Sequence, residues 1–170
     1  MQIIIEGIDR CGKTTLANEL SKVLNLDIYP RKTDVEYDKL ECGNVFNDYL
    51  KLFSNANLKS YIFDRAYYSE YVYGVLDRNY NIAASKIYVS AIEQMLALHK
   101  NPIVILCLSN NIAESSAQHG KDLKKYNDLF LELYYNISPL IMCLKIDSEQ
   151  SKAMCIKHIK SRLNGELNEK

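Results

Sequence analysis

The sequence predicts an α/β protein in which helices cover both faces of a parallel five-stranded sheet. Short apolar runs rich in β-branched residues alternate with longer stretches of helical periodicity. The runs are nearly all apolar, which is typical of strands buried on both faces, and strands that alternate with helices require crossover connections. Ligands bind beyond the carboxyl ends of the strands in such sheets, so the residues after each run are the candidates for function.

Five strands are predicted in the apolar runs, and helices in the stretches between them. The expected strands cover residues 2–6, 27–29, 60–64, 103–108 and 140–146. The expected helices cover residues 13–25, 36–54, 67–77, 82–99, 111–136 with an interruption near Gly120, and 148–163. Asn81 and Ser148 are expected N-caps, because their side chains can accept hydrogen bonds from the first helical turn.

Composition and charge limit the classes of function. The chain has 170 residues, 48% of them apolar and 25% charged, which indicates one folded domain over residues 1–170. Its 21 basic and 21 acidic side chains balance, so no net positive charge favours a nucleic-acid partner. Five widely spaced cysteines without a C-x-x-C pair argue against a disulfide framework or a zinc site. With no signal peptide and no long apolar run, we expect a cytoplasmic protein without a membrane partner.

The segment after the first expected strand matches a phosphate-binding loop. Residues 7–14 read G-I-D-R-C-G-K-T, which fits G-x-x-x-x-G-K-S/T and leads into an expected helix. The glycines let successive N–H groups point at one phosphate, and the helix N-terminus adds partial positive charge. The residues expected to bind the phosphates of ATP are Gly7, Asp9, Arg10, Cys11, Gly12, Lys13, Thr14 and Thr15. Such a loop does not by itself separate a kinase from a GTPase or a motor ATPase.

Charged side chains follow two other expected strands. Asp64 ends the third run and, with Thr14, is expected to hold Mg²⁺, although a helix N-cap or a pair with Arg65 is the alternative. Arg31 follows Pro30, which fixes the turn, and a solvated loop arginine is its alternative. No N-K-x-D segment for reading guanine is present, which disfavours a GTPase. Two arginines on separate loops suit a second phosphate facing the first, and this suggests phosphoryl transfer to a phosphorylated acceptor.

Three segments resemble the thymidylate kinase family. IEGIDRCGKTTLANEL resembles its P-loop, FDRAYYSEYVYG its Asp-Arg motif with the following aromatic helix, and YPRKT its Phe-Pro-Arg loop. The resemblance covers essentially the whole chain, and the short length is similar to the compact deoxynucleoside monophosphate kinases of phages and other viruses. It implies a three-layer P-loop kinase fold with a lid near residues 110–125, and a possible homodimer. It also implies transfer of the γ-phosphoryl of Mg-ATP to dTMP or a related deoxynucleoside monophosphate, in the host cytoplasm for a viral member.

The resemblance also implies a set of acceptor-binding residues. Asp9 would bond the 3′-hydroxyl, while Arg31 and Arg65 would clamp the 5′-phosphate. Tyr73 matches the aromatic residue that lies beneath the deoxyribose and excludes a 2′-hydroxyl, although the tyrosines of this helix also suit a core. Phe46 is the candidate for stacking on the base, with helical core as its alternative.

The predicted catalytic residues are Arg10, Lys13 and Asp64. Residues 79–161 contain no arginine, so the cations available to a lid are Lys121, Lys124 and Lys125. An arginine commonly stabilises the charge on the migrating phosphoryl group. Arg31 and Arg65 are assigned to the acceptor, and Arg78 and Arg162 lie far along the chain from the motifs, so Arg10 in the P-loop is the remaining choice. This pattern resembles the branch of the thymidylate kinase family that carries its catalytic arginine in the P-loop.

Two other functions compete with this interpretation. A deoxynucleoside kinase usually has a carboxylate base after its second strand, where this chain has Tyr29-Pro30-Arg31. A P-loop regulatory module would hydrolyse ATP slowly and transfer phosphate to no acceptor. Glu70, at a position where the family usually has a small residue, is expected either to contact a modified base or sugar or to be a solvated helix acid.

Overall fold

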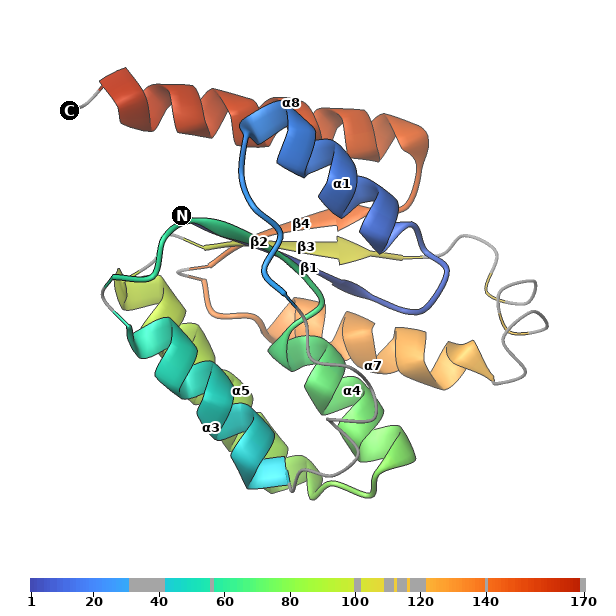
Figure 1. Ribbon diagram of the computed structural model, residues 1–170. Helices are drawn as coiled ribbons and strands as arrows, with labels where there is room; N and C mark the ends of the chain where they lie inside the picture. Colours follow the sequence, from blue (N-terminus) through green and yellow to red (C-terminus); the bar gives the residue numbers. More distant parts are fainter. Residues whose placement is uncertain are drawn as a thin grey trace.

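The computed structural model describes residues 1–30, 42–55, 57–99, 102–108, 112, 116, 122–139 and 141–168. Within them, four parallel strands form one sheet in the order β2-β1-β3-β4 (Figure 1). The strands are β1 (Gln2–Gly7), β2 (Tyr61–Asp64), β3 (Ile103–Cys107) and β4 (Met142–Ile146). Each coincides with a predicted apolar run to within two residues at either end. The two central strands, β1 and β3, therefore bring the phosphate-binding loop to the middle of the sheet edge.

The prediction of a fifth strand at residues 27–29 is wrong. In the described chain, Ile28 makes a single parallel bridge to Ile62 of β2. The N–H of Tyr29 donates to the carbonyl of Ile62 over 2.8 Å. Pro30 follows directly and has no N–H to donate, so the ladder of hydrogen bonds ends there.

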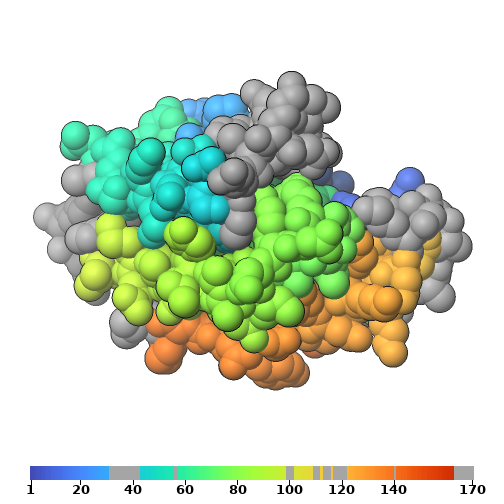
Figure 2. Space-filling view, turned by 90° about the horizontal axis from the view of Figure 1, so that it is seen from below, coloured from blue at the N-terminus to red at the C-terminus, as the bar shows by residue number. Residues whose placement is uncertain are grey.

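Helices lie on both faces of the sheet and complete three layers (Figure 1). One face is covered by α1 (Lys13–Leu24) and α8 (Glu149–Asn168), and the other by α3 (Cys42–Ser54), α4 (Tyr67–Asp77), α5 (Ile82–His99) and α7 (Leu123–Asn136). Figure 2 shows the second group from outside, where α3, α4, α5 and α7 form one face of the molecule. The predicted three-layer α/β architecture is confirmed, with four strands in place of five.

The core consists of two apolar clusters, one on each face of the sheet. Ile3 and Ile5 of β1 pack with Leu16 of α1, whereas Ile4 packs with Phe46 of α3 on the opposite face. Successive side chains of a strand point to opposite faces, so β1 contributes to both clusters. Burial on both faces explains why β1 reads as a continuous apolar run.

Helices α5, α7 and α8 begin at residues whose side chains cap the first turn, whereas α1 and α4 begin without a side-chain cap. Asn81 Oδ1 accepts from the N–H of Ala84 over 2.9 Å, and Ser148 Oγ accepts from the N–H of Ser151 over 3.1 Å. Both predicted N-caps are thereby confirmed. The side chain of Asp122 caps α7 in the same way.

Helix extents agree with the prediction for α4 and α5, and α8 continues beyond the predicted residue 163 to Asn168. Helix α3 begins at Cys42, and residues 36–41 of its predicted range lie outside the described residues. The same holds for most of the expected lid near 110–125, including Gly120. In the part of the chain that is described, no helix combines the length and apolar character that crossing a bilayer requires.

Candidate active site

The loop between β1 and α1 turns on two glycines with positive φ. Gly7 has a φ of +134° and Gly12 a φ of +83°. A Cβ atom on Gly7 would collide with the carbonyl oxygen of Cys107 on the neighbouring strand, so only glycine fits there. Gly12 precedes α1 and offers no side-chain cap, which leaves the first N–H groups of the helix for a ligand. The local geometry is that of an anion-binding loop.

Arg10 is a left-handed residue inside this loop. Its φ is +63°, a conformation that costs a non-glycine residue about 1–2 kcal/mol, and its side chain is exposed. Backbone strain of this kind is often kept at functional sites. The loop thus presents a guanidinium beside the position where phosphates are expected.

Lys13, by contrast, is buried. Its ammonium donates to the carbonyl of Ile8 and lies 3.5 Å from Cys11 Sγ. The side chain therefore folds back into its own loop, and a phosphate would have to replace these contacts with stronger charge-assisted ones.

Thr14 and Asp64 meet at the carboxyl ends of two neighbouring strands. Thr14 Oγ1 donates to Asp64 Oδ2 over 2.6 Å, although the residues are fifty positions apart. The other oxygen, Asp64 Oδ1, is buried and has no hydrogen-bond partner among the described residues. A hydroxyl beside a carboxylate with one unsatisfied oxygen suits Mg²⁺, which prefers oxygen ligands. The sequence placed both residues in a metal site, and the structure brings them together.

Asp9, Arg65 and Tyr73 form a second polar cluster beside the loop. Arg65 forms an ion pair with Asp9, and both side chains are about one-fifth exposed. The guanidinium lies 5.4 Å from the centre of the Tyr73 ring, within the range of a cation–π contact. Arg65 has a φ of +74° and donates its N–H to Ile5 of β1 over 2.9 Å. Three residues expected to bind the acceptor thus lie together.

Glu6 lies at the candidate site, although the sequence motifs did not predict a role for it. Its completely buried carboxylate accepts hydrogen bonds from the backbone N–H groups of Ala66, Tyr68 and Ser69, and from the Ser69 hydroxyl. These groups form the start of α4, directly after Arg65. Burial raises the pKa of Glu6 from 4.5 to about 7, while the hydrogen bonds and the charge of Arg65 oppose the rise. One acidic residue at the end of an apolar strand is the signal that could have revealed it.

Glu6→Gln should remove a pH-dependent contribution to stability. The folded-state pKa of Glu6 lies above its unfolded value, so Glu6 binds more protons in the folded state between pH 4.5 and about 7. The wild-type chain should therefore lose stability relative to Glu6→Gln as the pH rises through this window, by up to about 3 kcal/mol. Urea unfolding of both proteins at pH 5 and pH 7.5 measures this difference, in which all shared titrations cancel. A difference that does not change with pH would contradict the raised pKa.

A sequence comparison identifies the family of the chain, although no family model matches it. The SPbeta prophage-derived uncharacterized protein YorR of Bacillus subtilis (strain 168) is 30% identical over 142 residues, which cover 79% of this chain and 82% of that protein. The chain belongs to the YorR family.

Solved structures confirm the fold of this YorR-family chain. YorR in complex with phosphorylated GDP has a TM-score of 0.76 and 24% identity, covering 99% of this chain and 98% of that chain. Thymidylate kinase from Ehrlichia chaffeensis has a TM-score of 0.60 and 16% identity over 94% and 98% of the two chains. Deoxyadenosine kinase from M. mycoides with bound dCTP has a TM-score of 0.55 and 20% identity over 97% and 100%. The predicted P-loop kinase fold is confirmed, whereas membership of the thymidylate kinase family stays a prediction.

The remaining predicted site residues of the YorR-family chain are placed less favourably. Phe46 is completely buried, and its ring stacks on Tyr88 with the ring centres 5.3 Å apart, as the core alternative expects. Arg31 and Lys121 lie outside the described residues. Lys124 and Lys125 are exposed in the first turn of α7.

Glu70 of α4 is buried, which corrects the expectation of a solvated helix acid. Its side chain is 5% exposed and forms an ion pair with Arg78 over 2.8 Å. The ring of Tyr80 packs so closely on Gly74 that a Cβ atom there would collide with it. The segment after α4 is thus bound back onto the helix that carries Tyr73.

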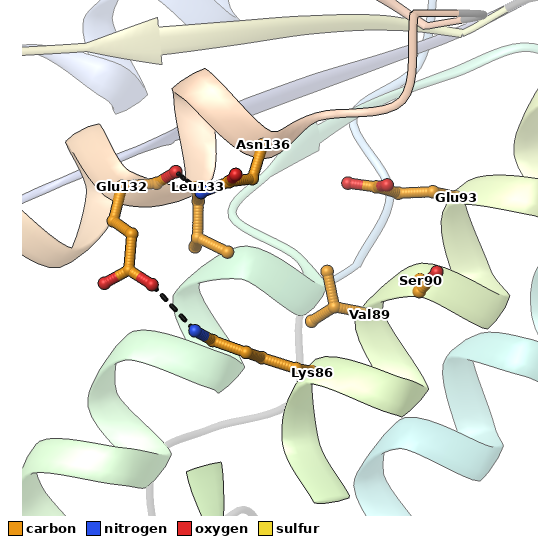
Figure 3. A pocket seen from close by; sticks show the side chains of 7 residues that line it. All are labelled: Lys86, Val89, Ser90, Glu93, Glu132, Leu133 and Asn136. Atoms are coloured by element: carbon orange, nitrogen blue, oxygen red, sulfur yellow. Dashed lines mark hydrogen bonds and ion pairs between the residues drawn. The ribbon is translucent and has the colours of Figure 1, made fainter. Parts of the chain in front are cut away.

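A cavity of about 410 Å³ lies between α5 and α7, and none of the predicted site residues lines it (Figure 3). Its lining residues are Lys86, Val89, Ser90, Glu93, Glu132, Leu133 and Asn136. Lys86 and Glu132 form an ion pair over 2.7 Å, and Glu93 accepts from the hydroxyl of Tyr68 and from the N–H of Ser138. The buried carboxylate of α5 therefore binds α4 and the segment that follows α7, rather than pointing toward the phosphate-binding loop.

Proposed function

We propose that this protein transfers the γ-phosphoryl group of Mg-ATP to a deoxynucleoside 5′-monophosphate, with dTMP as the default acceptor. The observation that carries the proposal is the cluster of Asp9, Arg65 and Tyr73 beside the phosphate-binding loop. A guanidinium held at the end of β2 can bind a dianionic phosphate by charge-assisted hydrogen bonds. Two phosphate sites that share the edge of one sheet suit a donor and a phosphorylated acceptor.

We assign a specific role to each of the candidate site residues. The N–H groups of the loop and the Lys13 ammonium bind the donor phosphates, and Arg10 faces the phosphoryl group as it moves. Arg65 orients the acceptor phosphate, and Arg31, from outside the described residues, would complete the clamp. Thr14 and Asp64 would hold Mg²⁺, which neutralises charge on the donor phosphates. Asp9 positions Arg65 and is available to the 3′-hydroxyl of the acceptor.

A deoxynucleoside kinase would need a carboxylate base for a neutral hydroxyl acceptor. Among the described residues near the loop, Asp64 contacts Thr14, Asp9 pairs with Arg65, and Glu6 binds the start of α4. Each of these three carboxylates thus already has a role in the proposed transfer to a monophosphate. This distribution favours the charged acceptor.

The acceptor range is tested by ADP release from Mg-ATP with dTMP, dUMP, dCMP, dGMP and dAMP, and with the free nucleosides. Because the YorR structure contains phosphorylated GDP and the mycoplasma kinase binds dCTP, purine and cytosine acceptors belong in the panel. We expect a monophosphate, with dTMP first, to be used far better than any nucleoside. Preference for thymidine over dTMP would support the deoxynucleoside kinase, and ADP release independent of every acceptor would support the regulatory module.

Tyr73→Ala should weaken the preference for deoxyribose over ribose. The Tyr73 ring packs between Arg65 and Tyr126, whose ring centre lies 5.2 Å away, so the ring is held firmly enough to act as a steric filter. The measurement is the ratio of kcat/KM for dTMP and for its ribose counterpart. Tyr73→Phe is the matched control, because it keeps the ring and should keep the wild-type ratio. An unchanged ratio in a folded Tyr73→Ala protein would assign Tyr73 to the core alone.

A further inference from the structure

The phosphate-binding loop contains one of two cysteines that lie beside Gly7. Cys11 lies in the loop and is partly exposed, whereas Cys107 is the last residue of β3 and is 1% exposed. Gly7 is paired in register with Cys107, so the two backbones are one strand spacing apart, about 4.8 Å. A Cβ atom on Gly7 would also lie 3.2 Å from Cys11 Sγ. Two cysteines nearly a hundred positions apart thus meet at one glycine, Cys11 through its sulfur atom and Cys107 through its backbone.

The surroundings of Cys11 favour its ionised form. Lys13 Nζ lies 3.5 Å from Cys11 Sγ, and the Cys107 thiol donates a hydrogen bond to the same sulfur. When protonated, Cys11 donates to the carbonyl of Ile8 over 2.9 Å. The Cys107 hydrogen bond and the neighbouring Lys13 charge lower the pKa of Cys11 below its usual value, although burial opposes this. The same contact raises the pKa of Cys107.

This environment distinguishes Cys11 from the other described thiols. Burial raises the pKa of Cys143 to about 12 and that of Cys155 to about 11. A lowered pKa raises the fraction of Cys11 that is ionised near neutral pH above that of a thiol with the ordinary value. A less basic thiolate is also a weaker nucleophile, so the gain in reaction rate is smaller than the gain in ionised fraction. Cys11 also has the solvent access that Cys155 lacks.

We propose that Cys11 is a modification site for low-molecular-weight disulfides, and that Cys107 converts the adduct into an intramolecular disulfide that closes the phosphate-binding loop. In the first step, the Cys11 thiolate attacks one sulfur of the reagent and releases its other half as a thiolate. In the second step, Cys107 attacks Cys11 Sγ, and its proton leaves with the departing thiol. Two protein thiols are oxidised to one disulfide, and the reagent is reduced to two thiols.

The modification should prevent nucleotide binding. The Cys11 N–H belongs to the loop that is expected to surround the phosphates, and Lys13 contacts the sulfur that would react. A disulfide between Cys11 and Cys107 of β3 would hold the loop in one position. It would also replace the Cys11 thiol that lies beside the Lys13 ammonium. The proposal requires that nucleotide binds at this loop, and it does not depend on which acceptor is used.

The test uses the full chain with Cys42→Ser, Cys143→Ser and Cys155→Ser, so that Cys11 and Cys107 are the only thiols left. After treatment with glutathione disulfide at pH 7, its intact mass should fall by two hydrogens. The affinity for ADP, measured by calorimetry, should weaken at least about tenfold, because the loop supplies the phosphate contacts. Dithiothreitol should restore both, and ADP added beforehand should slow the reaction.

Two further variants show which cysteine reacts in each of the two steps. With Cys107→Ser added, the protein should stop at a mixed disulfide carrying one glutathione, and with Cys11→Ser added it should stay unmodified. Mapping the modified peptides of the wild-type chain gives the same assignment without any substitution, so a variant that fails to fold does not decide the matter. The proposal is overturned if Cys11 stays reduced, if Cys107 reacts without Cys11, or if the oxidised protein binds ADP as tightly as the reduced one.

Discussion

Arg10→Ala is expected to lose at least about a hundredfold in kcat with little change in the KM for ATP or for the acceptor. Charge develops on the migrating phosphoryl group in the transition state, and an arginine that meets it is worth about 10³ to 10⁵ in rate in well-studied P-loop enzymes. Because this interaction forms mainly in the transition state, its loss lowers kcat and leaves substrate binding largely unchanged. Steady-state kinetics with both substrates varied gives the three constants.

The controls separate the charge of Arg10 from its backbone strain. Arg10 has a φ of +63°, so Arg10→Gly removes the side chain and relieves the strain, yet it should be as slow as Arg10→Ala. Arg10→Lys should also be slow, because lysine lacks the planar fork. Lys124→Ala and Lys125→Ala alter exposed cations of α7 and should lose less than about tenfold, since exposed side chains contribute little outside a site. Inactive lysine variants beside an active Arg10→Ala would place the catalytic cation in the lid.

Arg65→Ala should raise the KM for the monophosphate acceptor about tenfold to 150-fold, because charge-assisted hydrogen bonds contribute about 1.5–3 kcal/mol each. The KM for ATP should change little, since the donor phosphates lie in the loop after β1. Arg65 also pairs with Asp9, so its removal leaves a partly buried carboxylate beside the acceptor phosphate and adds repulsion. Kinetics at saturating ATP measures the effect.

Arg162→Ala is the matched control for Arg65→Ala. Arg162 lies on α8, on the opposite face of the sheet from the acceptor cluster, where its guanidinium contacts Met142 Sδ at 3.3 Å. Its removal should leave both KM values near those of the wild type. If Arg65→Ala raised the KM for ATP as much as that for the acceptor, Arg65 would belong to the donor site.

Much of the fold could be predicted because local patterns and the final structure agree. The apolar runs identified four strands, since strands buried on both faces have few polar positions. The bounds of α4 and α5 were predicted to the residue, because Asp64-Arg65 and Asn81 mark their starts. Residues 27–29 failed as a strand because three residues before a proline can sustain only one bridge.

The site was predictable where a motif fixes backbone geometry and less so where tertiary contacts decide. The loop glycines and the meeting of Thr14 with Asp64 follow from motif and strand order. The role of Glu6 needs the position of α4 relative to β1, and the contact of Cys11 with Cys107 needs the register of β1 and β3. Neither the relative position of two elements nor the register of two strands can be predicted from the periodicity of the sequence. The burial of Phe46 likewise depends on Tyr88 from a different helix.

Phosphoryl transfer to dTMP is tested most directly by following the transferred group itself. The protein is incubated with Mg²⁺, ATP labelled in the γ-phosphoryl group and dTMP, and the labelled products are separated and identified. We expect the label to appear in the β-phosphoryl group of dTDP, and we expect Arg10→Ala and Arg65→Ala to reduce its appearance strongly. Label found only in inorganic phosphate would contradict this prediction, and so would label that enters the 5′-position of thymidine in a parallel reaction while dTMP gives no labelled product.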